Sequence, residues 1–374
     1  MTSTSIGCLI RDLRVALSWS QGRLADELCR VSGHSTATRE DVSRWERGKR
    51  TPGPYWLAHL ATVLEVPLHV LEDAKMDRRT FVTSLAATAV APVVTADLIR
   101  EGFDAALHGG PDTEAWLDRL ARYGADYMTA GAAQIQQRVA HDLVVIQQQL
   151  ESPVMWGVAA KLMTLFAKTF PGADGAKAVT WYRRAAIAAD RSEDNETRVW
   201  VRGRAAIALG YEGAALPVAD LFAEQATQIE DKPSIGRLNA VMGKAHVAAL
   251  RGDDNRATEL LYEGKRLFDR AGSDDVASSD YAVPFWRMNV FMSLLLARHG
   301  AERNAIVARE TAMEYLPATL PRFRTHLEMH HGLMMVRSGD RKGGVAYAEE
   351  ALNALPPEKH SLTLRMLLGE IRDS

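Results

Sequence analysis

Apolar residues recur at helical spacing along most of the chain. In the first 75 residues they predict five short helices, separated by breaks rich in Gly, Ser, Thr and Pro. The first spans residues 6–17, where Leu9, Leu13 and Leu17 are four positions apart. The other four are expected in the segments SQGRLADELC, TREDVSRWERG, GPYWLAHLATVLEV and PLHVLEDA. From residue 95 onward the pattern is alanine-rich helix without strand-like alternation, so we predict an all-α protein.

The third short helix has a polar outer face. Thr38 can cap its start, and Gly48 is placed to end it. Burial of its apolar residues, Val42 and Trp45, leaves the following side chains outside: Glu40, Ser43, Arg44 and Arg47. Between residues 44 and 50, four cations (Arg44, Arg47, Lys49 and Arg50) face the single anion Glu46, a local balance of +3.

Two adjacent short helices, the second with a basic outer face, predict a helix-turn-helix. The major groove of DNA admits one helix, and arginine to guanine is the commonest base contact. The net charge of the chain is only −2, so any DNA contact must come from such a local patch. The alternative is a charged helix that is merely solvated.

This N-terminal block resembles the phage-repressor type of helix-turn-helix, the Xre-like family. The resemblance lies in LRVALSWSQGRLADEL and VSRWERGKRTPGPYWLAHLATVLEVP. It implies that Gln21 touches phosphate. It also implies base-facing positions at Arg39, Glu40, Ser43 and Arg44, and contacts to the duplex backbone from Arg47, Lys49 and Arg50. Arg14 and Glu46 match positions of an ion pair that ties the first helix to the recognition helix.

The turn before the recognition helix departs from this family. The segment RVSGHSTATR is several residues longer than the usual turn of about four. The angle between the two helices is therefore open. So is the choice between Arg39 and Glu40 as the residue that reaches a base.

Three glycines mark internal repeats in the remainder of the chain. Each follows a helix that ends near a basic residue, and each is followed five positions later by a small residue: Gly252 with Ala257, Gly300 with Ala305, and Gly339 with Gly344. Gly332 fits a small position in the last unit. This register resembles the tetratricopeptide repeat. We expect about five to seven helical hairpins, stacked into a right-handed superhelix with a long concave groove.

Polar residues near the expected inner face are candidates for effector binding. Counting back from the turn glycines gives Asn239, His246, Arg287 and His326. Asparagine can hold a peptide backbone through both its donor and its acceptor. The alternative is that these side chains are ordinary packing residues with satisfied hydrogen bonds.

Other chemistry has little support in the sequence. His326 and His330 are one helical turn apart, a spacing that can bind zinc, but a third ligand is not evident. Phosphate-binding glycine loops and catalytic triads are missing, so we expect neither a cofactor, a metal site nor an enzyme. Cys8 and Cys29 lie in helical stretches and indicate buried thiols.

The predicted organisation is a DNA-binding domain in residues 1–75, a linker and packing helix in 76–105, and a repeat domain in 106–374. Residues 76–94 include Arg78-Arg79 and mimic a twin-arginine export signal. A folded domain precedes them, and their apolar run is too weak for a membrane span. We therefore predict a cytoplasmic protein without a membrane role.

This combination resembles bacterial regulators that sense short peptide pheromones through tetratricopeptide repeats. It implies a transcriptional regulator in quorum sensing that binds double-stranded DNA as a homodimer and responds to a small peptide or other effector. The alternative is a scaffold located on DNA, whose repeats hold a protein partner. The operator, the effector and the direction of regulation stay open.

Overall fold

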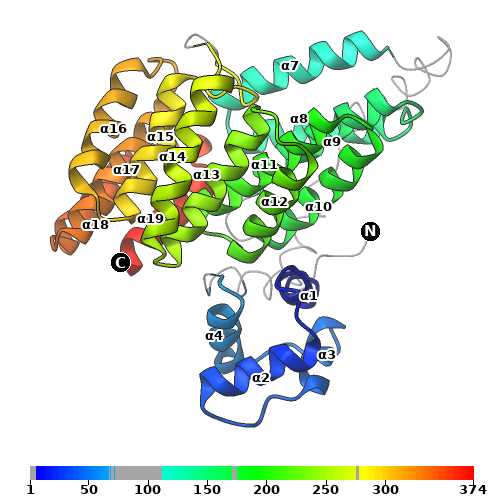
Figure 1. Cartoon of the computed structure of the whole chain (residues 1–374), viewed down its shortest axis with the longest axis vertical. Coiled ribbons are helices and arrows are strands. Elements are labelled where there is room, and N and C mark those ends of the chain that lie inside the picture. The colour runs from blue at the N-terminus through cyan, green and yellow to red at the C-terminus, as the bar shows by residue number, and fades with distance from the viewer. Residues whose placement is uncertain (1–5, 67, 69–70, 72–111, 171–174, 275–277) are drawn as a thin grey trace.

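The computed structural model describes residues 6–66, 68, 71, 112–170, 175–274 and 278–374. All regular secondary structure within these ranges is helical, which confirms the predicted fold class (Figure 1). The predicted linker and the segment with Arg78-Arg79 lie outside the described residues. Within the described ranges, no helix is both long enough and apolar enough to cross a membrane.

Four helices form the N-terminal unit. They are α1 (Ile6–Ala16), α2 (Gln21–Ser32), α3 (Arg39–Glu46) and α4 (Pro54–Val63). All four contribute side chains to its core, among them Leu9, Leu24, Val42 and Leu57, each at most 1% exposed. These helices match four of the five predicted from the apolar pattern. The fifth, expected in PLHVLEDA, falls mainly on residues outside the described ranges.

The second part is a stack of helical hairpins. Successive helices pair along the chain, as the repeat register predicts (Figure 1). They are α7 (Thr113–Thr129), α8 (Ala132–Ile146), α9 (Pro153–Lys168), α10 (Gly175–Arg191), α11 (Asn195–Glu212), α12 (Leu216–Ile229), α13 (Ile235–Leu250), α14 (Asp254–Ala271), α15 (Phe285–Arg298), α16 (Glu302–Tyr315), α17 (Pro321–Arg337), α18 (Arg341–Asn353) and α19 (Leu362–Asp373). A short 3-10 turn, η2 (Pro357–Lys359), precedes α19.

Glycines set both the turns and the spacing of these hairpins. Gly252, Gly300 and Gly339 adopt φ values of 76°, 75° and 104°, the left-handed region in which glycine is favoured. A Cβ atom added to Gly344 would lie 2.5 Å from the carbonyl oxygen of Gly332, so α17 and α18 approach closely only because both residues are glycine. The predicted turn glycines and small positions are confirmed.

The N-terminal unit packs directly on the repeats. Helix α1 contacts α10 and α12, and buried apolar residues of both parts form one continuous cluster. Arg183 of α10 donates to the side chain and the carbonyl oxygen of Asp12, both at 2.9 Å. Arg251, at the end of α13, lies 2.8 Å from Glu65. A rearrangement of the repeats therefore has a direct mechanical route to the N-terminal unit.

Helix α19 returns across the stack. It contacts α18 and α17, which come just before it, and also the distant α11. Glu370 of α19 binds the fully buried Arg298 side chain at 2.6 Å, and Thr363 donates to Glu212 at 2.9 Å. The long open groove expected between the first helices of the hairpins is therefore interrupted by the chain itself. The stack curves enough for a single helix to bridge α11 and α17.

Candidate DNA-binding face and effector cavity

Helix α3 presents the predicted recognition face. Val42 and Trp45 are 0% and 2% exposed, which fixes the rotation of the helix. Three predicted base-facing residues, Arg39, Glu40 and Arg44, are exposed on the other side, and Ser43 is half-buried. A capping box starts the helix: the Thr38 hydroxyl accepts from the Asp41 amide, and the Asp41 carboxylate accepts from the Thr38 amide.

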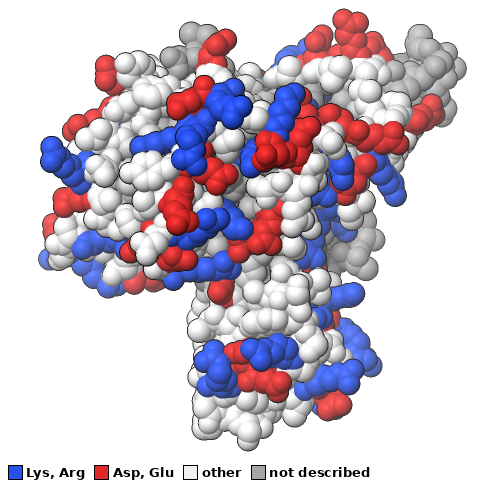
Figure 2. Space-filling view, in the orientation of Figure 1, with Lys and Arg blue, Asp and Glu red and all other residues white. Residues whose placement is uncertain are grey.

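The predicted phosphate-binding residues follow the end of α3. Gly48 has a φ of 66° and turns the chain after Arg47, so its predicted role as the helix-ending residue is confirmed. Arg47, Lys49 and Arg50 are exposed. Figure 2 shows basic side chains on the N-terminal unit, interspersed with acidic ones. Each of these residues is therefore accessible to a duplex laid against α3.

A buried ion pair holds the recognition helix in place. Arg14 of α1 donates to Glu46 at the end of α3 through two bonds, of 2.6 and 3.0 Å, and the Glu46 side chain is only 3% exposed. The predicted Arg14–Glu46 pair is confirmed. Gln21 also donates to Glu46, at 2.8 Å, a contact that the sequence did not predict. One N–H of the Gln21 amide is therefore used, and the other is left for the predicted phosphate contact.

The long turn before α3 is an ordered loop. Helix α2 continues to Ser32 and ends at Gly33, whose φ of 69° turns the chain. The Cys29 thiol donates to the carbonyl oxygen of Ala37 at 3.3 Å, which ties the far end of the loop to α2. The first residues of the apparent turn therefore belong to α2. The loop that remains, residues 33–38, is still longer than the usual turn.

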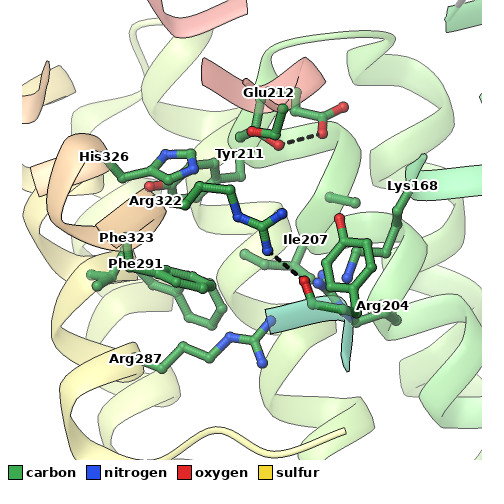
Figure 3. A pocket seen from close by; sticks show the side chains of 15 residues that line it. Lys168, Arg204, Ile207, Tyr211, Glu212, Arg287, Phe291, Arg322, Phe323 and His326 are labelled. Atoms are coloured by element: carbon green, nitrogen blue, oxygen red, sulfur yellow. Dashed lines mark hydrogen bonds between the residues drawn. The ribbon is translucent and has the colours of Figure 1, made fainter. Parts of the chain in front are cut away.

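A polar cavity of about 70 Å³ lies inside the repeats. Side chains of α7, α9, α11, α15 and α17 line it, together with residues at the start of α19. Its charged lining residues are Lys168, Arg204, Glu212, Arg287 and Arg322. Figure 3 shows Arg287 and Arg322 pointing into the same space from α15 and α17. The two aromatic rings of Phe291 and Phe323 form an apolar wall beside them.

Asp280, in the segment before α15, forms ion pairs with three of these residues but is not itself part of the cavity lining. Its side chain is fully buried and accepts from Lys168, from Arg204 at 2.9 Å and from Arg287 at 3.1 Å. Burial alone would raise the pKa of this carboxyl, but Arg204, Lys168 and Arg287 hold it well below the ordinary value. Asp280 is thus a carboxylate at neutral pH.

Two further lining groups have displaced pKa values. Burial raises the pKa of Glu212 to about 7, although a hydrogen bond from Thr363 and the charges of Lys168 and Arg204 oppose the change. Burial, reinforced by Arg322, lowers the pKa of His326 to about 3, so this imidazole is neutral. Glu212 therefore changes charge near neutral pH, and burial also lowers the pKa of Lys168 well below its ordinary value.

Two polar nitrogens at this cavity have no hydrogen-bond partner in the described part of the chain. They are the Nε of Arg287 and the Nδ1 of His326, on residues 4% and 5% exposed. Buried polar atoms nearly always find a partner, so an exception marks a place where a ligand or water can bind. Arg287 and His326 were both predicted as effector contacts, and the fold brings them to one site.

The other two predicted effector residues lie elsewhere. Asn239 and His246 are buried on α13, at 2% and 0% exposed, and α13 contributes no residue to the cavity lining. The Nδ1 of His246 bonds to Arg298 at 3.0 Å. Both side chains are buried as packing residues are, although the Nε2 of His246 has no hydrogen-bond partner among the described residues. Their role as effector contacts stays a prediction.

His330, the second member of the histidine pair on α17, has structural partners. His330 bonds to the Tyr211 hydroxyl at 2.8 Å and to Ser293 at 3.1 Å. Among the described residues, no three His, Cys, Asp or Glu side chains are grouped as metal ligands would be.

The sequence reasoning missed several cavity residues, namely Lys168, Arg204, Glu212, Asp280 and Arg322. One signal was available. Arg204 and Lys168 interrupt strongly apolar helical stretches, where a cation is buried only with a partner. That signal identifies unusual residues, but it does not show that they meet.

Comparison with known proteins gives limited information. No family model matches the sequence, and no curated protein matches it. Among solved structures, the crystal structure of Bacillus thuringiensis PlcR in complex with the peptide PapR7 and DNA is similar over 93% of this chain and 99% of that chain, at 13% identity and a TM-score of 0.34. At this score the likeness carries no argument about sites, and the function must be argued from the residues.

Proposed function

We propose that this protein is a sequence-specific transcriptional regulator with an Xre-type helix-turn-helix. The observation that supports this most is the geometry of α3. Its apolar side is fixed in the core, its end is anchored by Arg14–Glu46, and Arg39, Glu40 and Arg44 remain exposed. In helix-turn-helix proteins the exposed side of such a helix enters the major groove.

Individual roles follow from position. Arg44, exposed in the last turn of α3, reads a base together with Arg39, Glu40 or Ser43. Lys49 and Arg50, beyond the end of α3, bind phosphates with Arg47 and Gln21. Phosphate contacts set the register of the protein on the duplex, and base contacts give the sequence preference. The protein acts in the cytoplasm as a homodimer, because half-sites in such operators are read by paired domains.

The repeats regulate DNA binding by binding a small effector. The proposed effector is a peptide, and the regulation belongs to quorum sensing. Arg287 and His326 face the cavity and are the first candidates for effector contact. Helix α1 packs on α10 and α12, so a change in the repeats can alter how the reading units are held. An effector shifts DNA binding only by its different affinity for the two arrangements.

DNA binding is tested with Arg44→Ala and Lys49→Ala on genomic fragments selected by the wild type. We expect Arg44→Ala to lose about 1–3 kcal/mol of discrimination at one base position. Lys49→Ala should weaken binding to all sequences alike and reduce the salt dependence. Arg256→Ala is the matched control, since this arginine is exposed on α14, a helix of the repeats. Unchanged sequence preference in Arg44→Ala would show that α3 is not the reading helix.

A scaffold that binds a protein partner is the second candidate. A groove of about 590 Å³ along α14, α15 and α16 supports it, with Met288 and Met292 in its lining and the exposed Tyr262 and Val307 at its edge. Titration of operator affinity with culture extract separates the two candidates. A sensor responds to small molecules in the extract, whereas a scaffold retains a stoichiometric protein partner and does not respond.

A further inference from the structure

We propose that the cavity between α11, α15 and α17 binds an anionic group, a carboxylate or a phosphate, and that this group anchors the effector. The inference rests on the proposed sensor function in calling the ligand an effector. The anion site itself can be tested without DNA. Three observations carry it: the charge balance, the unpaired donors and the size of the space.

The charge balance of the cavity is positive. Arg204, Arg287 and Arg322 carry guanidinium groups, which stay protonated in proteins. Two carboxyl groups carry the opposite charge: Asp280, which pairs with Arg204 outside the lining, and Glu212, which is part of the lining. At least one positive charge therefore remains when both carboxyl groups are ionised. The excess is larger when Lys168 is charged or Glu212 is protonated.

Arg322 is the cation whose charge is least compensated. Its Nη2 donates to the carbonyl oxygen of Tyr127 at 2.7 Å, and its guanidinium lies over the rings of Tyr127 and Phe323. These partners are neutral, and the residue is only 6% exposed. Keeping a charge out of water without a counter-charge is unfavourable, so an anion placed beside it is strongly favoured.

Two nitrogens without a hydrogen-bond partner belong to residues that line this cavity. The Nε–H of Arg287 has no acceptor in the described part of the chain, although its other nitrogens bond to Asp280 and to three carbonyl oxygens. The neutral His326 can donate from the unpaired Nδ1. Arg287, His326 and Arg322 line one cavity, so an anion bound there has donor groups on three residues around it. Bonds of this charge-assisted kind are roughly twice as strong as neutral ones.

The size of the space limits what enters. A volume of about 70 Å³, measured as the space open to the centre of a water-sized sphere, is several times the roughly 10–15 Å³ that holds one water molecule. It accommodates a carboxylate or a phosphate with a few further atoms. The adjoining Phe291 and Phe323 favour a small apolar substituent beside the anion. The effector is thus either a small organic acid or phosphate ester, or a peptide that inserts one carboxylate.

The test measures anion binding to the full-length protein by calorimetry and thermal unfolding at constant ionic strength. The probes are inorganic phosphate, acetate, and neutral tripeptides with either a free or an amidated C-terminus. Saturable binding with a raised Tm is expected for at least one anion, with chloride as the reference. Binding by phosphate or acetate identifies the small-anion source, and binding only by the free-acid tripeptides identifies the peptide source.

Two variants give effects of opposite sign. Arg322→Gln should lower the affinity for the anion by about tenfold or more, because it removes an uncompensated buried charge. Glu212→Gln should raise the affinity for the same anion above about pH 7, because it removes the opposing carboxylate. A loss of packing would not raise affinity, so this second variant keeps the test decisive if Arg322→Gln folds poorly. Arg303→Gln, which removes the same charge from the exposed side of α16, is the matched control and should change nothing.

The proposal is overturned if no probe binds saturably, or if Arg322→Gln and Arg303→Gln bind an anion equally well. Operator binding, measured on the same preparations, separates this outcome from failure of the proposed function. Loss of anion binding with intact operator binding rejects the cavity as the effector site. Anion binding that leaves operator affinity unchanged supports the site and rejects the sensor function.

Discussion

In the N-terminal unit, the buried guanidinium of Arg14 faces one carboxylate, Glu46, through two hydrogen bonds. In the cavity of the repeats, Asp280 is shared by Lys168, Arg204 and Arg287, and the partners of Arg322 among the described residues are neutral. The first arrangement is balanced and fixes the position of a helix. The second has excess charge, so a ligand that supplies the missing negative charge stabilises it.

The exposed arginines of α3 are a third arrangement of charged side chains. They remain hydrated, and water screens their charge, so they add little to stability. In the proposed function their partner is external, the phosphates and bases of a duplex. Under that proposal, paired charges in this protein serve stability and unpaired charges serve recognition. Variants that remove one member of each set should separate these roles.

The largest effect is expected for Asp280→Asn. It leaves three buried cations without their shared anion and should lower the free energy of unfolding by about 3–5 kcal/mol. Urea unfolding followed by circular dichroism measures this, with the exposed Asp118→Asn on α7 as the control. Inorganic phosphate should raise the Tm of Asp280→Asn more than that of the wild type. An equal shift in both would contradict an unbalanced cavity.

Glu46→Ala tests the balanced ion pair of the N-terminal unit. It leaves Arg14 without its carboxylate and also frees the Gln21 amide, so a loss of about 3 kcal/mol is expected. Glu40→Ala, on the exposed side of the same helix, should change stability by less than about 0.5 kcal/mol. The same unfolding measurement compares the two. If both variants unfold like the wild type, Arg14–Glu46 is not a structural pair.

The smallest effect concerns pH. Burial raises the pKa of Glu212 from 4.5 to about 7, so between these values the folded chain binds more protons than the unfolded chain. Stability contributed by this group is therefore full below about pH 4.5 and is lost as the pH rises through 7, by about 1–3 kcal/mol. Lys168, Arg204 and Thr363 face the carboxyl and oppose the shift.

Glu212→Gln removes this dependence. Its free energies of unfolding at about pH 5 and about pH 8 should differ less than those of the wild type. A variant with the same pH dependence as the wild type would mean that another group titrates in this range.

Local patterns predicted the N-terminal unit well. Apolar spacing gave the rotation of α3 through Val42 and Trp45, and the cap at Thr38 follows from short-range hydrogen bonds. The Arg14–Glu46 pair came from the family resemblance. Contacts within such a unit are largely determined by residues a few turns apart, which is why sequence reasoning works there.

The cavity could not be predicted in the same way. Lys168, Arg204 and Asp280 come from α9, α11 and the segment before α15, and they meet only after several hairpins have stacked. The return of α19 to α11 is a second long-range event, without a signal in the local pattern. Turn glycines gave the register of the repeats, but the curvature of the stack decides which inner residues converge.

The position of α19 also has a consequence for biosynthesis. Chains fold in order of synthesis, so the N-terminal unit and the hairpins up to α18 can form before α19 is made. Ser361 and Thr363 line the cavity from the start of α19, and Glu370 neutralises the buried Arg298. A nascent chain that lacks this helix can therefore already possess the folded N-terminal unit while its cavity is unfinished. Under the proposed function, the ability to bind DNA should precede the ability to respond to the effector on the ribosome.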